Sequence, residues 1–188
     1  VISKPRLLFL ILIISGFWMI QHQMYATMPK YVLRLAGEQA APEWVANVNP
    51  LTVMLFVVLI TNLMSRFRAV TSLTAGMFIM PVSALLMSSK YFLEQTAGNS
   101  ISFFGLFALH PVVVMMIVGI IFQGLAECFI SPRYFEYFSK QAPKGEEGLY
   151  LGFSHLHSFF ANLIGFGISG FLLDAFCPNP EKPELAGL

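Results

Sequence analysis

Glu127 and Gln123 are the residues of this chain best suited to bind a proton or a charged solute. Glu127 follows a long stretch without charged residues, and Gln123 precedes it by four positions, which places both side chains on one helix face. Burial in apolar surroundings disfavours the ionised form of a carboxyl group unless a cation lies beside it. Such a group can carry a proton or bind an amine. The alternative is a glutamate that reaches water at the end of its helix or makes a structural hydrogen bond.

Three consecutive polar residues interrupt the first apolar stretch, namely Gln21, His22 and Gln23. Successive helical residues diverge by about 100°, so the three side chains cannot all face one cavity. They either line a binding site or form a polar turn at a membrane surface, with Tyr25 among the interfacial aromatic residues.

The last apolar stretch carries two overlapping patterns. His155 and Asn162 share one helix face, and their spacing is consistent both with lining a cavity and with hydrogen bonds between helices. Ala161, Gly165 and Ser169 are spaced by four and form a ridge of small residues. Such a ridge is typical of a close contact between two membrane helices.

Two motifs resemble cofactor or metal signatures but lack the context that these require. The glycines Gly165, Gly167 and Gly170 match G-x-G-x-x-G, yet no strand precedes them. His155 and His157 are two residues apart, so their rings point to nearly opposite helix faces, whereas zinc ligands on one helix are spaced by four. The sequence also has no nucleophile elbow and no Cys-x-x-Cys. It therefore predicts neither an enzyme nor a bound cofactor or metal.

The composition indicates a membrane protein. Of the 188 residues, 56% are hydrophobic and only 11% are charged, against about 25% charged residues in soluble domains. Together with a mean hydropathy of +0.71, this excludes a soluble globule, a disordered chain and a nucleic-acid-binding protein with a basic stripe. The net charge of +1 indicates no polyanionic partner, and the two cysteines are too few for a disulfide framework.

Five long windows contain no charged residue: 7–29, 44–65, 69–89, 95–126 and 148–173. A bilayer core requires about 20 mostly apolar residues per helix. Coil and open sheets cannot satisfy their backbone groups in lipid, and the windows lack the alternation of barrel strands. The sequence therefore predicts an all-α integral membrane protein with five transmembrane helices.

Pro111 divides the longest window, because proline is favoured in the first turn of a helix. The predicted spans are 7–29, 45–65, 69–89, 110–131 and 148–174, with 91–109 as an external loop. They form one membrane domain over residues 1–176, and residues 177–188 are a polar tail or loop.

The basic residues predict the orientation, because cytoplasmic connections carry an excess of Lys and Arg. With a cytoplasmic amino terminus, that side holds seven: Lys4, Arg6, Arg66, Arg68, Arg133, Lys140 and Lys144. The other side then holds four: Lys30, Arg34, Lys90 and Lys182. The first residues also resemble a signal peptide, but no small-residue cleavage site follows them. With five spans and a first residue that is not Met, we expect part of a larger protein.

Residues Phe122 to Gly170 resemble the tenth and eleventh helices of the proton-dependent oligopeptide transporter (POT) family, within the major facilitator superfamily. The family pattern is met by Gln123, Ala126-Glu127, Glu136, Gln141-Ala142-Pro143 and Asn162. Phe17-Trp18 followed by Gln23 is similar to the family's seventh helix, and Asn49-Pro50 to the start of its eighth.

This resemblance implies that the chain holds helices seven to eleven of twelve, which are five helices of a six-helix half bundle. It implies a multi-pass protein of the inner or plasma membrane that takes up di- or tripeptides or related solutes together with protons. The substrate would lie between this half and an amino-terminal half. Glu127 would bind the amino terminus of the substrate. The other candidate substrate-binding residues are Gln123, Asn162, His155, Gln23, His22 and Asn49.

Two departures from the family pattern leave a second function open. His22 stands where the family often has an acidic residue, and residues 65–68 form only a degenerate version of the basic motif that follows helix eight. The alternative is a facilitator-superfamily transporter or exporter of a non-peptide solute.

Overall fold

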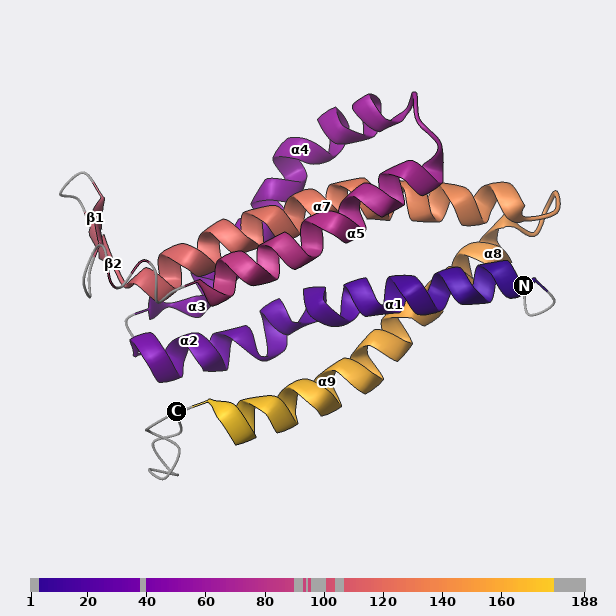
Figure 1. Ribbon diagram of the computed structural model, residues 1–188. Coiled ribbons are helices and arrows are strands. Elements are labelled where there is room, and N and C mark those ends of the chain that lie inside the picture. Colours follow the sequence, from indigo (N-terminus) through magenta and orange to yellow (C-terminus); the bar gives the residue numbers. More distant parts are fainter. Residues whose placement is uncertain are drawn as a thin grey trace.

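The computed structural model describes residues 4–37, 40–89, 93, 95, 101–103 and 107–177. These residues form an elongated bundle of helices with a short hairpin at one end (Figure 1). The elements are α1 (Pro5–Ala26), α2 (Met28–Ala36), α3 (Pro42–Ala46), α4 (Val48–Met64), α5 (Ala69–Ser88), β1 (Ile101–Phe103), β2 (Phe107–Leu109), α7 (Pro111–Gln141), α8 (Glu147–Ser154) and α9 (Leu156–Phe176).

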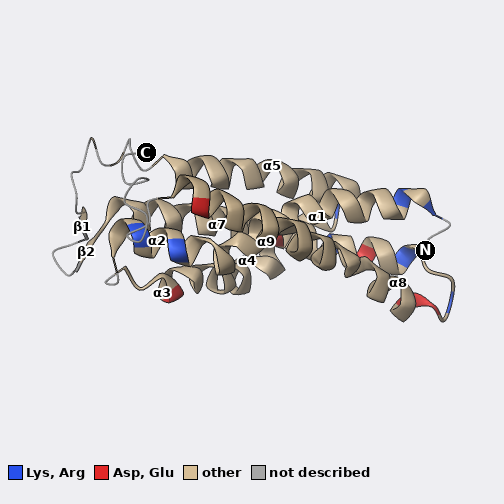
Figure 2. Ribbon diagram, turned by 90° about the horizontal axis from the view of Figure 1, so that it is seen from below, with Lys and Arg blue, Asp and Glu red and all other residues tan. Residues whose placement is uncertain are grey.

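Five helical segments are long and apolar enough to cross a membrane. They are Pro5–Ala26, Pro42–Met64, Ala69–Ser88, Pro111–Gln141 and Glu147–Phe176. Charged residues gather toward the two ends of the bundle, and few lie between them (Figure 2). The prediction of an all-α membrane protein with five spanning helices is therefore confirmed.

Three of the predicted spans are interrupted in the structure, and the second of them, 45–65, has a turn at Asn47 between α3 and α4. The first breaks at Thr27, where α1 ends and α2 begins with Pro29 in its first turn; proline lacks the N–H that a continuous helix needs and disfavours helix in the residue before it. The last breaks at His155, between α8 and α9. There the side chains of Ser154 and His155 both bond the carbonyl oxygen of Leu151, which competes with the helical backbone bonds.

The fourth helix is longer than the predicted span 110–131. α7 passes through Pro132 and ends at Gln141, a length of 31 residues. The Ser72 hydroxyl of α5 donates to Phe129 O at 2.7 Å in the turn before the proline. Such contacts with a neighbouring helix allow a proline inside a membrane helix, which explains why the sequence pattern placed the end too early.

Part of the predicted loop 91–109 and most of the tail 177–188 lie outside the described residues. Within the described part of the loop, β1 and β2 pair antiparallel, with Ile101 opposite Leu109. The structure therefore adds a short hairpin before α7, an element that the sequence reasoning had treated only as loop.

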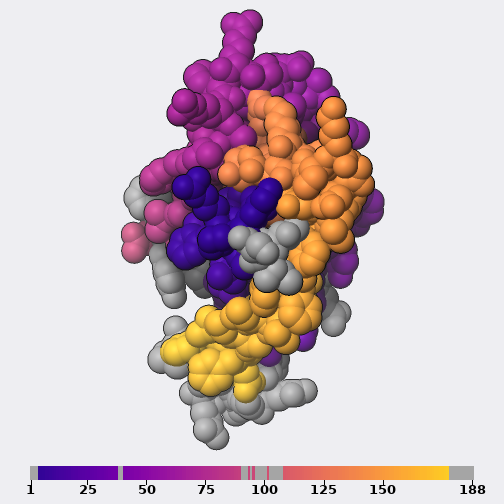
Figure 3. All heavy atoms as spheres, turned by 90° about the vertical axis from the view of Figure 1, so that its right-hand side faces the viewer, coloured from indigo at the N-terminus to yellow at the C-terminus, as the bar shows by residue number. Residues whose placement is uncertain are grey.

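The helices pack in two groups along the bundle. α5 and α4 pack on α7, whereas α9 packs mainly on α1. Seen from the end that carries the amino terminus, α9 lies at one edge of the molecule and the α4–α5 region at the other (Figure 3). The small-residue ridge lies in the α1–α9 contact, where a Cβ added at Gly165 would lie 2.7 Å from Met19 Cγ.

Candidate functional site

Glu127 is joined to two other helices by hydrogen bonds. Its Oε2 accepts from Gln21 Nε2 of α1 at 2.9 Å and from Asn49 Nδ2 of α4 at 3.1 Å. The same Gln21 nitrogen lies 3.4 Å from Asn49 Oδ1. These three residues, from α1, α4 and α7, form a closed polar network inside the bundle.

The network holds a carboxyl group among neutral donors. Gln21 and Asn49 are only 1% and 5% exposed, and Glu127 is half-buried. Glu136 pairs with Arg133 and Lys140, whereas Glu127 forms no ion pair with a Lys or Arg of the described part of the chain. Amide donors partly replace the water that a carboxylate loses on burial, so the site can accept a cationic ligand.

A glycine lets α4 approach α7 at this point. A Cβ added at Gly124 would lie 2.9 Å from Thr52 Cβ and 3.0 Å from Asn49 Oδ1. Real Cβ atoms do not come so near to neighbouring atoms, so a larger residue would displace α4. Gly124 is thus a positioning residue for Asn49, and the sequence reasoning did not include it.

Gln123 is buried beside the network but lines a separate cavity. Its side chain is 3% exposed, and its Oε1 has no hydrogen-bond partner. The cavity, of about 210 Å³, lies between α1, α2, α5 and α7. Its lining includes Gln23 and the methionines Met24, Met28, Met87 and Met116. The predicted face shared by Gln123 and Glu127 therefore presents one residue to a cavity and the other to the hydrogen-bond network.

The three consecutive polar residues of α1 have three different environments. Gln21 reaches Glu127, whereas Gln23 bonds within α1, donating to Met19 O at 3.1 Å and accepting from Thr27 Oγ1 at 2.6 Å. His22 is half-buried, and its ring centroid lies 5.4 Å from that of Trp18. The candidate residues Gln23 and His22 thus do not bond to Glu127, and Gln21, which was not among the candidates, does.

The candidate residues His155 and Asn162 are not among the hydrogen-bond partners of Glu127. His155 is exposed, and its ring stacks on Phe135 with centroids 5.1 Å apart. Asn162 is half-buried on α9 and takes no part in the Gln21–Asn49–Glu127 network. α9 packs mainly on α1, and its ring contacts with α7 are those of His157 with Tyr134 and Phe135.

Comparison with known proteins places this arrangement in a family. The model of the POT family matches residues 5–184. The chain belongs to the POT family. The resemblance read from the Gln123-to-Asn162 pattern is thereby confirmed, and the chain is a multi-pass protein of the cell membrane from a family of transporters.

The curated relatives are named as multidrug resistance proteins and not as oligopeptide transporters. Multidrug resistance protein MdtH of Cronobacter sakazakii is 27% identical over 186 residues, which cover 97% of this chain and 41% of that protein. Multidrug resistance protein MdtH of Klebsiella pneumoniae is 26% identical over 188 residues, covering 98% and 42%. This POT-family chain thus spans about two fifths of the length of these relatives. No solved structure matches it significantly.

Proposed function

We propose that the complete protein is a proton-coupled secondary transporter of small amine-bearing solutes, in the first instance di- and tripeptides. Glu127 binds the protonated amine. The observation that carries this proposal is a half-buried carboxylate that is held by two neutral amides and, among the described residues, has no Lys or Arg as ion-pair partner.

A primary ammonium group matches the acceptors around Glu127. It has three N–H donors and no acceptor. Besides the carboxylate, the Oε1 of Gln21, which bonds Glu127 through its Nε2, is buried without a hydrogen-bond partner. Attraction between opposite charges is much stronger in a site of low dielectric than in water, so one carboxylate supported by this carbonyl oxygen gives a selective amine site.

The same carboxyl group links binding to protonation. Ionised Glu127 attracts the ammonium group, and protonated Glu127 does not. In a secondary transporter, alternating access moves one repeat of the helices against the other around a site near the midplane. The partners of this half are thus the amino-terminal half, the lipid bilayer, the solute and protons.

A second candidate is the transport or export of non-peptide amines. It is favoured by the names of the relatives, which are multidrug resistance proteins. It is also favoured by the methionines in the cavity beside Gln123, because flexible thioether side chains adapt to varied apolar groups.

Uptake by the complete protein in proteoliposomes with an imposed proton gradient tests both candidates. Three probes are compared: a dipeptide, the same dipeptide with an acetylated amino terminus, and a lipophilic amine without a peptide bond. Uptake of the free dipeptide alone supports peptide symport. Transport of the lipophilic amine in the direction opposite to the protons, with neither dipeptide transported, supports the second candidate. Equal uptake of both dipeptides contradicts amine recognition.

A further inference from the structure

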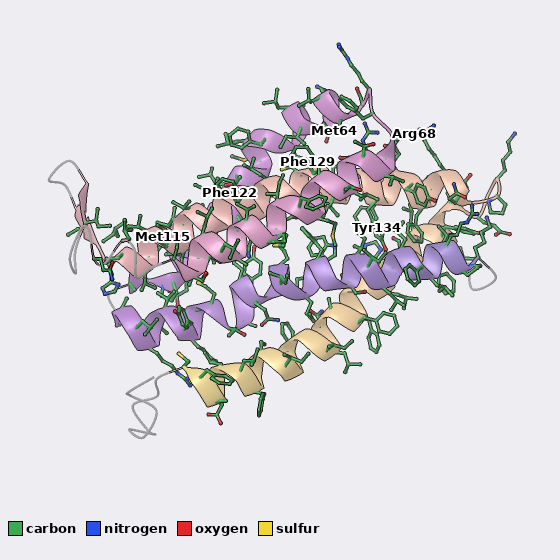
Figure 4. All side chains as sticks on the ribbon, in the orientation of Figure 1. Met64, Arg68, Met115, Phe122, Phe129 and Tyr134 are labelled. Carbon is green, nitrogen blue, oxygen red and sulfur yellow. The ribbon has the colours of Figure 1, made fainter. Side chains whose placement is uncertain are left out.

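A second polar cluster lies beside the Glu127 network and takes no part in it. The indole of Trp18 lies next to two imidazoles, with ring centroids 5.4 Å from His22 on the same helix and 5.3 Å from His157 on α9. The ring of Tyr134, from α7, meets that of His157 edge-on at 5.1 Å. Tyr134 lies on the side of α7 that faces α1 (Figure 4). We name His22, Trp18 and His157 the histidine–tryptophan cluster.

His157 can take up a proton without losing a hydrogen bond. It is 2% exposed, with Nδ1 2.6 Å from Ser154 O and Nε2 3.0 Å from Ser158 Oγ. Because a carbonyl only accepts, Nδ1 carries a hydrogen in the neutral ring, and Nε2 accepts from the Ser158 hydroxyl. A hydroxyl rotates to donate or to accept, so the protonated ring donates from both nitrogens to the same two partners.

His22 has an open position for a proton. Its Nδ1 is buried and has no hydrogen-bond partner. A buried polar atom without a partner costs free energy, and each such atom in a native structure calls for an explanation. Protonation of this nitrogen would place an imidazolium beside Trp18, and a cation within about 6 Å of an indole centroid is attracted by its ring.

We propose that the histidine–tryptophan cluster is a proton-binding site, in which one proton is held by His22 or His157 against Trp18. Two imidazolium ions beside one indole would repel each other strongly in a medium of low dielectric, so the cluster holds one proton at a time. In the complete protein this proton would be coupled to the movement of the solute, and that coupling role rests on the proposed function. Because Gln21 and His22 are adjacent on α1, the proton site and the Glu127 amine site would share one helical turn.

Several ionisable groups lie on the helices packed around the cluster. His155 directly precedes α9, and its ring centroid lies 6.1 Å from that of His157. α7 contributes Glu127, bonded to Gln21, and the Tyr134 hydroxyl, which donates to Ser154 O. On α7, Glu136 pairs with Arg133 and Lys140, and on α8 the ring of Tyr150 lies under the Lys4 ammonium. The other ionisable residues on α1, α7, α8 and α9 are Arg6, Tyr25, Cys128, Tyr137, Glu147 and Asp174. α4 and α5 contain no titratable side chain within their bounds.

Trp18 itself reports protonation, because an adjacent imidazolium quenches indole fluorescence. The complete protein is prepared with Trp44→Phe, and with every tryptophan outside this chain replaced, so that Trp18 is the only one left. Its fluorescence is followed from about pH 8, above the range in which histidine ordinarily titrates, down to the lowest pH at which the protein stays folded. We expect quenching as the pH falls, and loss of the transition in the double variant His22→Gln/His157→Gln.

His22→Gln alone keeps the test valid if the double variant fails to fold, because it leaves both hydrogen bonds of His157 in place. It should weaken the transition or shift its midpoint. His110→Asn is the matched control, since His110 lies at the start of α7, and the transition should stay unchanged. A flat titration of the parent protein, or a full transition in the double variant, overturns the proton site.

Transport assays distinguish a failure of the coupling role from a failure of the proposed function. The double variant should keep substrate exchange across the membrane at equal pH and lose uptake driven by a proton gradient. Unchanged gradient-driven uptake would overturn the coupling role while the amine-transport proposal stands. If the parent protein transports no amine yet Trp18 titrates as expected, the proposed function fails and the proton site stands.

Discussion

Gln21 Nε2 donates to Glu127 Oε2 at 2.9 Å and thereby connects α1 to α7 in the middle of the bundle. The bond is supported from a third helix, because Asn49 Nδ2 of α4 donates to the same oxygen. Two amides thus hold one carboxylate oxygen in a defined position. This fixed position makes a charge-selective role for Glu127 testable by small changes of its side chain.

Glu127→Gln in the complete protein should weaken binding of a dipeptide by at least about 1.4 kcal/mol, or tenfold. Glutamine keeps the shape and removes the charge that attracts the ammonium group. An amine-blocked dipeptide is the control ligand, and its affinity should remain nearly unchanged. Isothermal titration calorimetry on purified protein measures both affinities. Equal losses for the two ligands would mean that Glu127 is structural, and no loss for either would remove the peptide hypothesis.

Gln21→Leu should destabilise the protein more than Gln23→Leu. The first change removes a buried donor and leaves Glu127 and Asn49 with fewer partners, which costs about 1–3 kcal/mol. The second removes hydrogen bonds that Gln23 makes only within α1. Thermal unfolding of the two variants in the same detergent compares them directly. Equal midpoints would contradict the interhelical role of Gln21.

Gly124→Ala should weaken substrate binding through the position of α4. The added methyl group would lie 2.9 Å from Thr52 Cβ and 3.0 Å from Asn49 Oδ1, so Asn49 must move away from Glu127. Gly152→Ala is the matched control, because nothing among the described residues lies within 4 Å of a Cβ there. Dipeptide affinity should fall in the first variant and stay constant in the second. Unchanged affinity in Gly124→Ala would show that the Asn49 bond is dispensable for binding.

The sequence predicted the features of the site that depend on a single helix. It did not predict which side chains meet, because that depends on how each helix is rotated about its axis. The i, i+4 spacing of Gln123 and Glu127 and the proline that starts α7 are local signals, and they are found as expected. Which of Gln21, His22 and Gln23 faces Glu127 depends on the rotation of α1. That rotation depends on how α1 packs against α9, including the close contact of Gly165 with Met19, and such contacts link residues far apart in the chain.

Other differences also have a physical cause outside the local pattern. α7 continues through Pro132 and receives a hydrogen bond from Ser72 of α5 at Phe129 O in the preceding turn, and a single sequence does not show which neighbour a helix will have. His155 was placed in the cavity as part of one continuous helix. It lies instead at the break between α8 and α9, because its side chain and that of Ser154 bond the Leu151 carbonyl.

Gly165→Leu should disrupt the packing of α9 on α1. Its side chain would enter space occupied by Met19 and Gln23, and overpacking of this kind costs about 1–3 kcal/mol. Gly167→Leu is the matched control, because a Cβ at Gly167 meets nothing within 4 Å among the described residues. Thermal unfolding of the complete protein should show a lower midpoint for the first variant only. Equal midpoints would mean that the ridge tolerates bulk and that α9 can shift along α1 without loss.

The orientation of the bundle can be tested at Ser139. Lys4 Nζ donates to Gln141 O at 2.8 Å, so the start of α1 and the end of α7 lie at one end of the bundle, where Lys140 and Lys144 also lie. Because cytoplasmic connections carry an excess of Lys and Arg, we expect this end to face the cytoplasm. A single cysteine at Ser139, with Cys128 and Cys177 replaced by serine, should react with a membrane-impermeant maleimide only after the cells are opened. A cysteine at Trp44, which is 78% exposed on α3 near the other end, should react in intact cells. The reverse pattern of labelling would invert the topology, and it would place the side with seven of the eleven basic residues outside the cell.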